Sequence, residues 1–412
     1  MKKRSALIWL FICIVHTNYA QNFDLGDIQS SLEGVSVDES IRFEEIDDLM
    51  FVRIQINQSE KYFRFLVDTG APTGISPEVA QIIRPKLGRK VMVKSSGAKD
   101  DSLALVLLDS IKIGKLCFKQ IVAFVTDFNQ GEIMKCYEID GIIGGNLMAA
   151  AIWQFDKSRK QIRITKNLKN LDFIQKTYRQ DMGLYGWQKS PLLDISLNDK
   201  RIKEKVMLDT GYGGFFSWSR NTYQESLRRK ILDSSRILQG SGTAVETIFG
   251  KDADSLVYNV QLDNIRLGKI RFDDPVVDVD LDRGSKIGVR LLNQYIITLD
   301  FPQGQMYAYK ITDETPKKKL ESFGFSAYIQ ENDIYVTLLW NHSPASKAGI
   351  RLYDRIIEVN GISFRNINAY NKCTLFLELR KILHNNQEID IQFASEGLTK
   401  TAHLKKEVLL GD

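Results

Sequence analysis

A short segment of the sequence occurs twice, and this repetition constrains the fold more than any other feature. Residues 65–70 read Phe-Leu-Val-Asp-Thr-Gly, and residues 206–211 read Val-Met-Leu-Asp-Thr-Gly. Three apolar residues in a row are typical of a buried strand, and the Thr-Gly pair after each Asp indicates a tight turn. Each copy is therefore predicted to be a buried strand that ends in an aspartate, Asp68 in the first copy and Asp209 in the second.

The similarity continues on both sides of these segments. A turn residue, Asn57, lies eleven residues before Asp68. Asn198 lies at the same distance before Asp209. Two further pairs of segments match in the same order, residues 109–115 with 263–269 and residues 143–156 with 287–300. The ordered matches predict an internal duplication of roughly a hundred residues.

The duplicated segments resemble those of the aspartic proteases, in both the two-lobed pepsin-like and the retroviral-type branches. Residues 68–71, Asp-Thr-Gly-Ala, are similar to the catalytic signature of that family. Residues 140–144, Asp-Gly-Ile-Ile-Gly, are similar to the segment that passes behind its active-site loop. The short, β-rich segments between turns agree with a mainly β fold. The resemblance covers about residues 40–310 and implies two homologous barrel-like lobes related by a pseudo-twofold axis, residues 35–165 and 191–312, joined by a linker at 166–190.

The resemblance assigns catalysis to the two aspartates. Asp68 and Asp209 would meet at the axis, where two close carboxylates cannot both ionise cheaply and therefore share a proton. The ionised member would take a proton from the water that attacks a peptide carbonyl. The protonated member would donate a hydrogen bond to the carbonyl oxygen. The expected activity is endopeptidase cleavage of extended peptides or proteins.

The residues that follow each aspartate are expected to support the site. By resemblance, Thr69 and Thr210 would hydrogen-bond across the axis and hold the two loops rigid. Gly70 and Gly211 would let backbone N–H groups approach the carboxylates. Because both copies lie in one chain, catalysis would not need a dimer.

The positions of the histidines exclude other hydrolytic sites from the duplicated region. Apart from one histidine near the N-terminus, all of them follow that region: His342, His384 and His403. A Ser-His-Asp or Cys-His site within the repeats is therefore excluded, and so is a zinc site with histidine ligands. Carboxylates remain as the acid-base groups, and the sequence predicts no metal or cofactor.

Two features depart from the family pattern. Ala71 and Tyr212 follow the two glycines, and neither supplies a hydroxyl that would hydrogen-bond a carboxylate and favour its ionised form. We therefore expect a dyad less acidic than that of pepsin and activity that extends toward neutral pH.

Residues 92–108 are predicted to form a flap hairpin, but this segment contains no Tyr. Tyr212 could instead block the cleft, so a catalytically inactive peptide-binding or scaffold protein of the same fold is the alternative.

The first twenty residues have the pattern of a secretory signal. A basic start is followed by an apolar run at residues 6–15 and by Ala20 before the expected cleavage point. An uncleaved anchor is the alternative. No later stretch approaches eighteen apolar residues, so no membrane span is expected in the mature chain. Residues 1–20 are therefore predicted to export the protein to a periplasmic, cell-surface or extracellular location.

Composition and cysteine content add two expectations. The 56 basic and 51 acidic side chains are mixed along the 412 residues, which is typical of a solvated surface and predicts no nucleic-acid partner. Cys13 would leave with the signal. Cys117 and Cys136 fall in one lobe and could form a disulfide, with Cys373 left free, while three reduced thiols are the alternative.

The C-terminal residues differ in character from the duplicated region. Residues 348–350, Ala-Gly-Ile, and 354–361, Asp-Arg-Ile-Ile-Glu-Val-Asn-Gly, resemble a PDZ domain that covers residues 318–408. The resemblance implies an α+β module that binds an extended peptide strand or a C-terminus, with Phe323, Gly324 and Phe325 as the loop that holds the carboxylate. Alternatively, the two phenylalanines fill the core and the module is a spacer.

Overall fold

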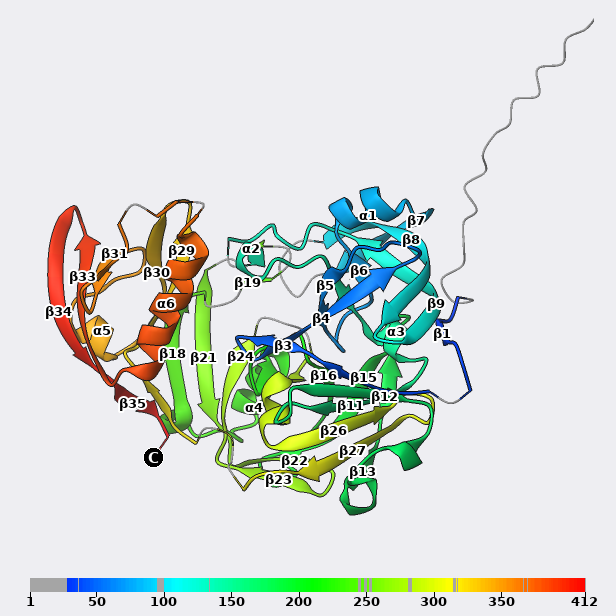
Figure 1. The fold of residues 1–412 in the computed structure, drawn as a ribbon. Helices are drawn as coiled ribbons and strands as arrows, with labels where there is room; N and C mark the ends of the chain where they lie inside the picture. The colour runs from blue at the N-terminus through cyan, green and yellow to red at the C-terminus, as the bar shows by residue number, and fades with distance from the viewer. Residues whose placement is uncertain are drawn as a thin grey trace, which may run out of the picture.

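The structure is a computed structural model that describes residues 28–411, apart from residues 36, 95–99, 133, 244–245, 248–249, 252–253, 281–283, 314–315, 317, 366 and 369. The predicted signal, residues 1–20, lies outside the described residues. The described chain is mainly β, as expected, and Figure 1 shows two lobes with a third body to one side. None of its helices has the length and apolar character needed to cross a membrane.

Lobe 1 is built on a closed ring of six strands. The long strand β8 pairs with β4 on one side and with β9 on the other, which closes the ring and confirms the barrel-like form. In sheet order the strands are β1 (Ser31–Leu32), β9 (Leu116–Val125), β6 (Gly74–Ile75), β10 (Gly141–Ile143), β5 (Phe63–Val67), β4 (Leu49–Ile56), β8 (Asp100–Ile113) and β7 (Lys86–Lys94), with β3 (Glu44–Ile46) beside β4. The predicted flap is the β7–β8 hairpin, in which Lys94 pairs with Asp100. Residues 95–99 at its tip lie outside the described residues.

Lobe 2 repeats this order of pairing. Its strands are β23 (Ile270–Asp273), β22 (Asn264–Leu267), β15 (Ser190–Leu197), β16 (Ile202–Asp209), β25 (Lys286–Gly288), β17 (Phe216–Ser219), β24 (Val276–Asp280), β21 (Ser255–Gln261) and β18 (Ile237–Gly242), with β14 (Gly183–Tyr185) beside β15. The β18–β21 hairpin occupies the place that β7–β8 holds in lobe 1. A small hairpin of β19 (Glu246–Thr247) and β20 (Gly250–Lys251) follows β18.

The registers around the two aspartates are the same. In lobe 1, β10 lies parallel to β5 and pairs Ile143 with Val67, the residue before Asp68. In lobe 2, β25 lies parallel to β16 and pairs Ile287 with Leu208. Each Asp-Thr-Gly turn therefore leaves a central strand at the same point of an equivalent sheet.

A six-stranded sheet joins the two halves of the chain. In order its strands are β13 (Tyr178–Asp181), β27 (Gln305–Lys310), β26 (Tyr295–Asp300), β11 (Ile152–Asp156), β12 (Gln161–Thr165) and β2 (Asp38–Arg42). At its centre β11 of the first half pairs with β26 of the second half. Two strands lie in the predicted linker at 166–190: β13 joins this sheet, and β14 pairs with β15.

Helices are short, and serines begin several of them. Ser76 accepts a hydrogen bond from the N–H of Val79 at the start of α1 (Pro77–Ile83). Such a cap satisfies a backbone donor that the helix leaves free. The other helices of the lobes are α2 (Met134–Tyr137), α3 (Gly145–Met148), α4 (Arg220–Arg228) and the 3₁₀ turns η1 (Leu168–Asn170), η2 (Ile174–Lys176), η3 (Ser234–Arg236) and η4 (Val289–Asn293).

The C-terminal domain follows the lobes, at residues 320–410. Phe323 and Phe325 are buried in its core, as is Phe376. Its elements are β28 (Leu320–Ser322), β29 (Phe325–Gln330), β30 (Asp333–Trp340), α5 (Pro344–Lys347), β31 (Arg355–Val359), β32 (Ile362–Ser363), α6 (Lys372–Asn385), β33 (Glu388–Ser395), β34 (Leu398–Lys405) and β35 (Glu407–Leu410).

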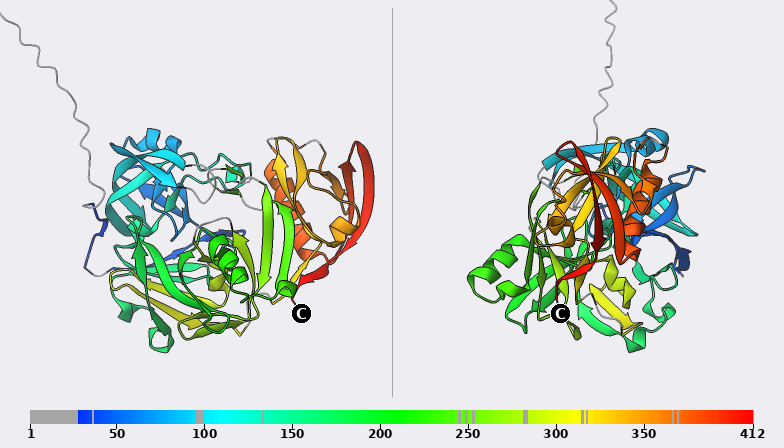
Figure 2. Two further views of the ribbon diagram at one scale, coloured as in Figure 1. Left: turned by 180° about the vertical axis from the view of Figure 1, so that it is seen from behind. Right: turned by 90° about the vertical axis from the view of Figure 1, so that its left-hand side faces the viewer.

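This domain is not a loosely attached module. Strand β18 of lobe 2 pairs with β30, with Gly240 opposite Trp340, so one sheet runs from lobe 2 into the domain. Figures 1 and 2 show β18 and β21 standing between lobe 2 and the C-terminal domain. Buried apolar side chains of lobe 1 and of the C-terminal domain also belong to one contiguous cluster.

The disulfide differs from the expected one. Cys136 pairs with Cys373, 237 residues away, and Cys117 is free. Cys117 lies half-buried on β9, whereas Cys373 stands near the start of α6 and docks against α2 of lobe 1. The prediction was wrong because spacing along the chain cannot show how two domains dock.

The disulfide should stabilise the docked C-terminal domain. We expect the double change Cys136→Ser, Cys373→Ser to lower the free energy of unfolding by about 2–4 kcal/mol, since the cross-link closes a long loop in the unfolded chain. Thermal or urea unfolding would measure the loss, and Cys117→Ser is the matched control with little effect. A non-reduced digest that linked Cys136 to Cys117 would contradict the assignment.

Candidate active site

Asp68 and Asp209 lie on two loops that face each other where the lobes meet. A Cβ added at Gly70 would lie 2.7 Å from Cγ of Asp209. A Cβ added at Gly211 would lie 2.4 Å from Oδ2 of Asp68. Each carboxyl group therefore packs against the glycine of the opposite loop, and neither glycine position has room for a side chain. The structure thus brings together the two aspartates that the sequence singles out.

Reciprocal hydrogen bonds join the two loops through their threonines. The N–H of Thr69 donates to Oγ1 of Thr210 at 3.0 Å, and the N–H of Thr210 donates to Oγ1 of Thr69 at 3.1 Å. Each hydroxyl then donates across the interface, Thr69 to the Leu208 carbonyl at 2.6 Å and Thr210 to the Val67 carbonyl at 2.8 Å. Both threonines are buried. All four bonds cross between the lobes, so the positions of the two aspartates depend on each other.

Backbone N–H groups hold both carboxylates. Gly70 donates to Oδ1 of Asp68 at 2.8 Å, and Gly211 donates to Oδ1 of Asp209 at 3.0 Å. Burial raises the pKa of Asp68 well above its ordinary range, and the adjacent Asp209 raises it further. The N–H groups of Gly70 and Ala71 oppose this increase, but burial is the larger effect. The pair therefore retains a proton at a pH where a solvated aspartate has lost it.

Tyr212, the unusual residue of the second loop, is held by lobe 2. Its N–H donates to Oδ1 of Asp209 at 3.1 Å, so its backbone supports the site. Its hydroxyl donates to Asp278 at 2.7 Å, and the Nζ of Lys286 lies 5.3 Å from the centre of its ring. The ring also fills the space beside Gly214. These contacts fix the side chain against the strands of its own lobe.

A half-buried glutamate that the sequence analysis did not select supports the strand that leads into the second loop. Glu204 lies on β16 and accepts hydrogen bonds from the hydroxyls of Ser285 and Thr222, at 2.7 and 3.0 Å, and from the indole of Trp218 at 3.2 Å. Burial raises its pKa in spite of these three donors. A signal was present in the sequence, because Glu204 occupies an inward position of a strand whose inward neighbours are Val206 and Leu208.

Ser190 supports the first loop from the other half of the chain. Its hydroxyl donates to the carbonyl of Gly70 at 2.9 Å, and the residue is fully buried. Gly144 closes the back of the same loop, because a Cβ there would lie 2.2 Å from the carbonyl carbon of Pro72. The apolar-Gly segment thus lies behind the first loop, as the resemblance implied.

The Phe323–Phe325 loop belongs to the C-terminal domain rather than to the aspartate site. Gly324 has a φ of +94°, a conformation that favours glycine. Its N–H donates to the hydroxyl of Ser322 at 3.0 Å, and its carbonyl accepts from Trp340 at 2.9 Å. One of the N–H groups expected to hold a carboxylate is therefore already engaged.

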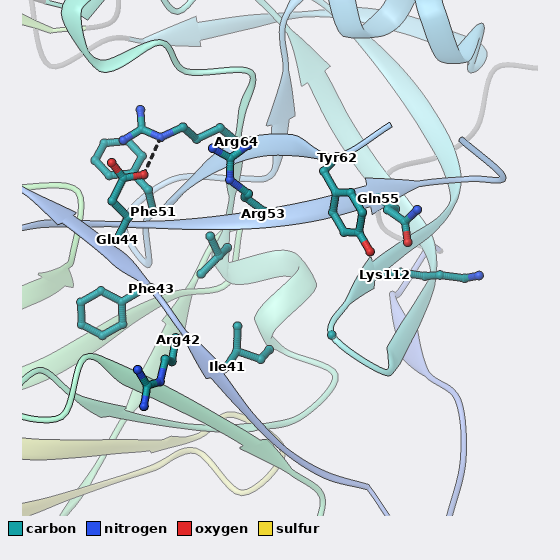
Figure 3. A pocket seen from close by; sticks show the side chains of 12 residues that line it. Ile41, Arg42, Phe43, Glu44, Phe51, Arg53, Gln55, Tyr62, Arg64 and Lys112 are labelled. Atoms are coloured by element: carbon teal, nitrogen blue, oxygen red, sulfur yellow. Dashed lines mark hydrogen bonds and ion pairs between the residues drawn. The ribbon is translucent and has the colours of Figure 1, made fainter. Parts of the chain in front are cut away.

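A separate pocket of about 440 Å³ lies on lobe 1, and neither aspartate lines it. Figure 3 shows Arg53 and Arg64 on adjacent strands at its wall, with Arg64 extended toward Glu44. Arg64 pairs with Glu44 at 3.1 Å and lies 4.1 Å from the centre of the Phe51 ring. Among the residues that the structure describes, no cluster of three metal-ligating side chains occurs.

The threonine pair should be essential for the stability of the site. We expect Thr69→Val to lower the free energy of unfolding by about 2 kcal/mol or more, because the Thr210 N–H and the Leu208 carbonyl would be left buried without partners. Thr69→Ser keeps the oxygen and should stay within about 1 kcal/mol of the native protein. Denaturant unfolding compares the two variants, and equal losses would contradict the role of the hydroxyl.

Comparison with known proteins finds a match to one family and a short match to one curated protein. Residues 52–147 match the aspartyl protease family, a span that begins within β4, includes β5, Asp68 and β10, and ends before Asp209. A 54-residue stretch, 13% of this chain, is 33% identical to the Tax1-binding protein 3 homolog of Caenorhabditis elegans. The match covers 43% of that protein, which is less than half of its length.

Three solved structures show weak overall similarity. Basic 7S globulin from soybean is 13% identical, with a TM-score of 0.40 over 69% of this chain and 96% of its own. Aspartic proteinase from Irpex lacteus is 11% identical, with a TM-score of 0.40 over 67% and 98%. A retropepsin-like aspartic protease from Rickettsia conorii is 21% identical, with a TM-score of 0.23 over 33% and 94%. Scores this low do not establish a shared fold, whereas the match of residues 52–147 to the aspartyl protease family supports a general protease function.

Proposed function

We propose that this protein is an aspartic endopeptidase in which Asp68 and Asp209 form the catalytic dyad. The observation that carries the proposal is the interlocked geometry of the two Asp-Thr-Gly loops, in which each carboxyl group lies against the glycine of the other loop. An ordinary pair of turns has no need for reciprocal, buried hydrogen bonds between the Thr69 and Thr210 backbones and hydroxyls.

The geometry suits hydrolysis through a shared proton. Two carboxyl groups this close favour the state in which one is ionised and one is protonated. The ionised group activates a water molecule, and the protonated group donates to the carbonyl oxygen as negative charge develops on it. The proton then passes to the leaving amine, which restores the dyad. The fixed N–H groups of Gly70 and Gly211 keep both carboxylates in place during these steps.

We also infer that the C-terminal domain, residues 318–408, acts as a PDZ-like module for extended peptides or C-termini. Strand β29 pairs with β30 along one edge, and among the described strands it has no partner on the other edge. Helix α6 lies beside β29, with the rings of Phe376 and Tyr328 6.3 Å apart. We call this edge of β29, together with the adjacent side of α6, the proposed peptide site. An added peptide strand would pair with the backbone of β29 along this edge.

The proposal includes export through the N-terminal signal. Disulfides persist in oxidising compartments and are rare in the cytosol, and the pairing of Cys136 with Cys373 supports such a location. A periplasmic, cell-surface or extracellular site remains the prediction, and N-terminal sequencing of the mature protein would test cleavage after Ala20.

Removal of either aspartate should abolish cleavage. We expect Asp68→Asn and Asp209→Asn each to lower kcat on a mixed peptide library on the order of 10³-fold or more, because the two groups act as one unit. Asp194→Asn, a change to an exposed carboxylate on β15, is the matched control. Pepstatin should inhibit the native protein. Peptide binding without turnover in the native protein would instead favour the inactive binding protein of the same fold.

The raised pKa of Asp68 predicts how activity depends on pH. The dyad needs one proton, and burial holds that proton on the pair above the ordinary aspartate pKa of 3.8. Activity should therefore decline only as the pH rises through the raised value, so the alkaline limb of the pH–rate profile should lie well above pH 4. A profile confined to pH values below about 4 would contradict this expectation.

The raised pKa of Asp68 also predicts how the stability of the folded protein depends on pH. The folded state binds the Asp68 proton more tightly than the unfolded state does, so stability falls as the pH rises from the unfolded pKa toward the folded one. The neutral variant Asp68→Asn lacks this penalty and should have a higher Tm than the native protein at pH 7. At pH 3, where the native carboxyl is already protonated, the difference should disappear. Calorimetry at the two pH values measures both.

A further inference from the structure

The C-terminal domain is attached to both lobes, and its two attachments fall on opposite sides of the proposed peptide site. Strand β29 is connected to lobe 2, and helix α6 is connected to lobe 1. A peptide that entered between these elements would act on both lobes at once.

The attachment to lobe 2 consists of backbone hydrogen bonds. Strand β18 pairs with β30 over residues 240–242. The N–H of Thr243 donates to the Thr337 carbonyl at 2.7 Å, and the N–H of Asn341 donates to the Gln239 carbonyl at 3.0 Å. Because β29 pairs along the length of β30, it is held in the same sheet as β18. From β18 the ladder continues through β21, β24, β17 and β25 to β16, which ends at Asp209.

The attachment to lobe 1 is covalent and ionic. The disulfide joins Cys373 of α6 to Cys136 of α2. Two ion pairs flank it on the same helix, Lys372 with Glu132 and Arg380 with Asp47. Helix α6 is therefore held to lobe 1 at its first turn and again two turns later.

The segment that carries Cys136 leads directly to the Asp68 loop. Ile143 follows Cys136 by only seven positions, and its carbonyl accepts the N–H of Asp68 at 3.0 Å. Within this segment the Asp140 carboxylate accepts the N–H of Arg64 on β5 at 2.8 Å. The disulfide thus connects α6 to the short segment that leads to the strand behind Asp68.

We propose that a peptide strand bound at the proposed peptide site regulates the aspartate dyad by changing the position of lobe 1 relative to lobe 2. An added strand separates α6 from β29, and the two attachments pass this displacement to the two Asp-Thr-Gly loops. The dyad responds because both carboxyl groups must meet one water molecule. The proposal rests on the proposed function. The coupling is reciprocal for binding: a ligand at the dyad changes the affinity for the peptide by the same factor by which the peptide changes the affinity for that ligand.

The test starts from a peptide chosen on the full-length protein. A display library of random peptides with free C-termini supplies the probe, and its tightest binder is synthesised and checked by mass spectrometry to remain intact. Hydrogen exchange is then measured with and without this probe. We expect protection at residues 325–330, where the strand adds, together with altered exchange at residues 64–70 and 140–147. We also expect kcat/KM on a separate fluorogenic peptide to change by about fivefold or more.

Breaking the lobe 1 attachment should uncouple the two sites. In the double variant Cys136→Ser, Cys373→Ser the probe should still protect residues 325–330, which shows that the domain is folded. The effects at residues 64–70 and on kcat/KM should be lost. Cys117→Ser, the matched control, should behave like the native protein.

The outcomes separate this proposal from the proposed function. Protection at residues 325–330 with no change near Asp68 would overturn the coupling, and so would the failure of every library peptide to protect β29. A protein that cleaves nothing, yet shows the linked exchange changes, would contradict the peptidase assignment and leave the coupling supported.

Discussion

The hydrogen bonds between Thr69 and Thr210 are the interaction on which the rest of the structure depends. They lie where two separately built lobes meet, and each bond satisfies a buried group that would otherwise cost about 1–3 kcal/mol. Because the bonds are reciprocal, neither loop can shift without disturbing the other. The adjacent glycines then allow the two carboxyl groups to approach closely. The threonines thus set the distance at which Asp68 and Asp209 interact.

Close approach of two carboxyl groups opposes the stability of the fold. Burial and the charge of Asp209 both disfavour ionisation of Asp68, so the site stores a penalty that the surrounding structure must offset. The compensation is visible around the site. Ser190 supports the first loop, and Glu204 with its three donors supports the strand that leads into the second. Such strain is typical of sites selected for chemistry rather than for stability.

The C-terminal domain extends this dependence beyond the lobes. Its sheet is continuous with lobe 2 through β18, while its longest helix is linked to lobe 1 by a disulfide. In lobe 1 the equivalent hairpin, β7–β8, has no such partner among the described strands. The two equivalent hairpins therefore have different surroundings, because β18–β21 takes part in a domain contact and β7–β8 pairs only with strands of its own lobe among the described residues. This asymmetry gives the second half of the chain a structural role that the first half lacks.

Much of the fold was predictable because its signals are local. The apolar run before each aspartate, the Thr-Gly turns and the ordered matches specify strands and turns within a few residues, and the structure places Asp68 and Asp209 together as expected. The pairing of β13 with β27 within the linker could not be predicted, since β13 has no local signal apart from the sheet that it joins. Glu204 was missed because an acidic residue in a strand reads as exposed unless its neighbours across the sheet are known.

The sequence by itself determined the mainly β class, the repeated Asp-Thr-Gly turns and the absence of histidine from the repeats, because these follow from residue type and spacing. Only the tertiary structure decided the partner of Cys136, the hydrogen-bond partners of Glu204 and the connection of the C-terminal domain to both lobes. Each of these depends on contacts between segments that lie far apart in the chain or in different sheets. The physical reason is that local patterns select strands and turns, whereas docking depends on the shape and charge of surfaces that exist only after the lobes have folded.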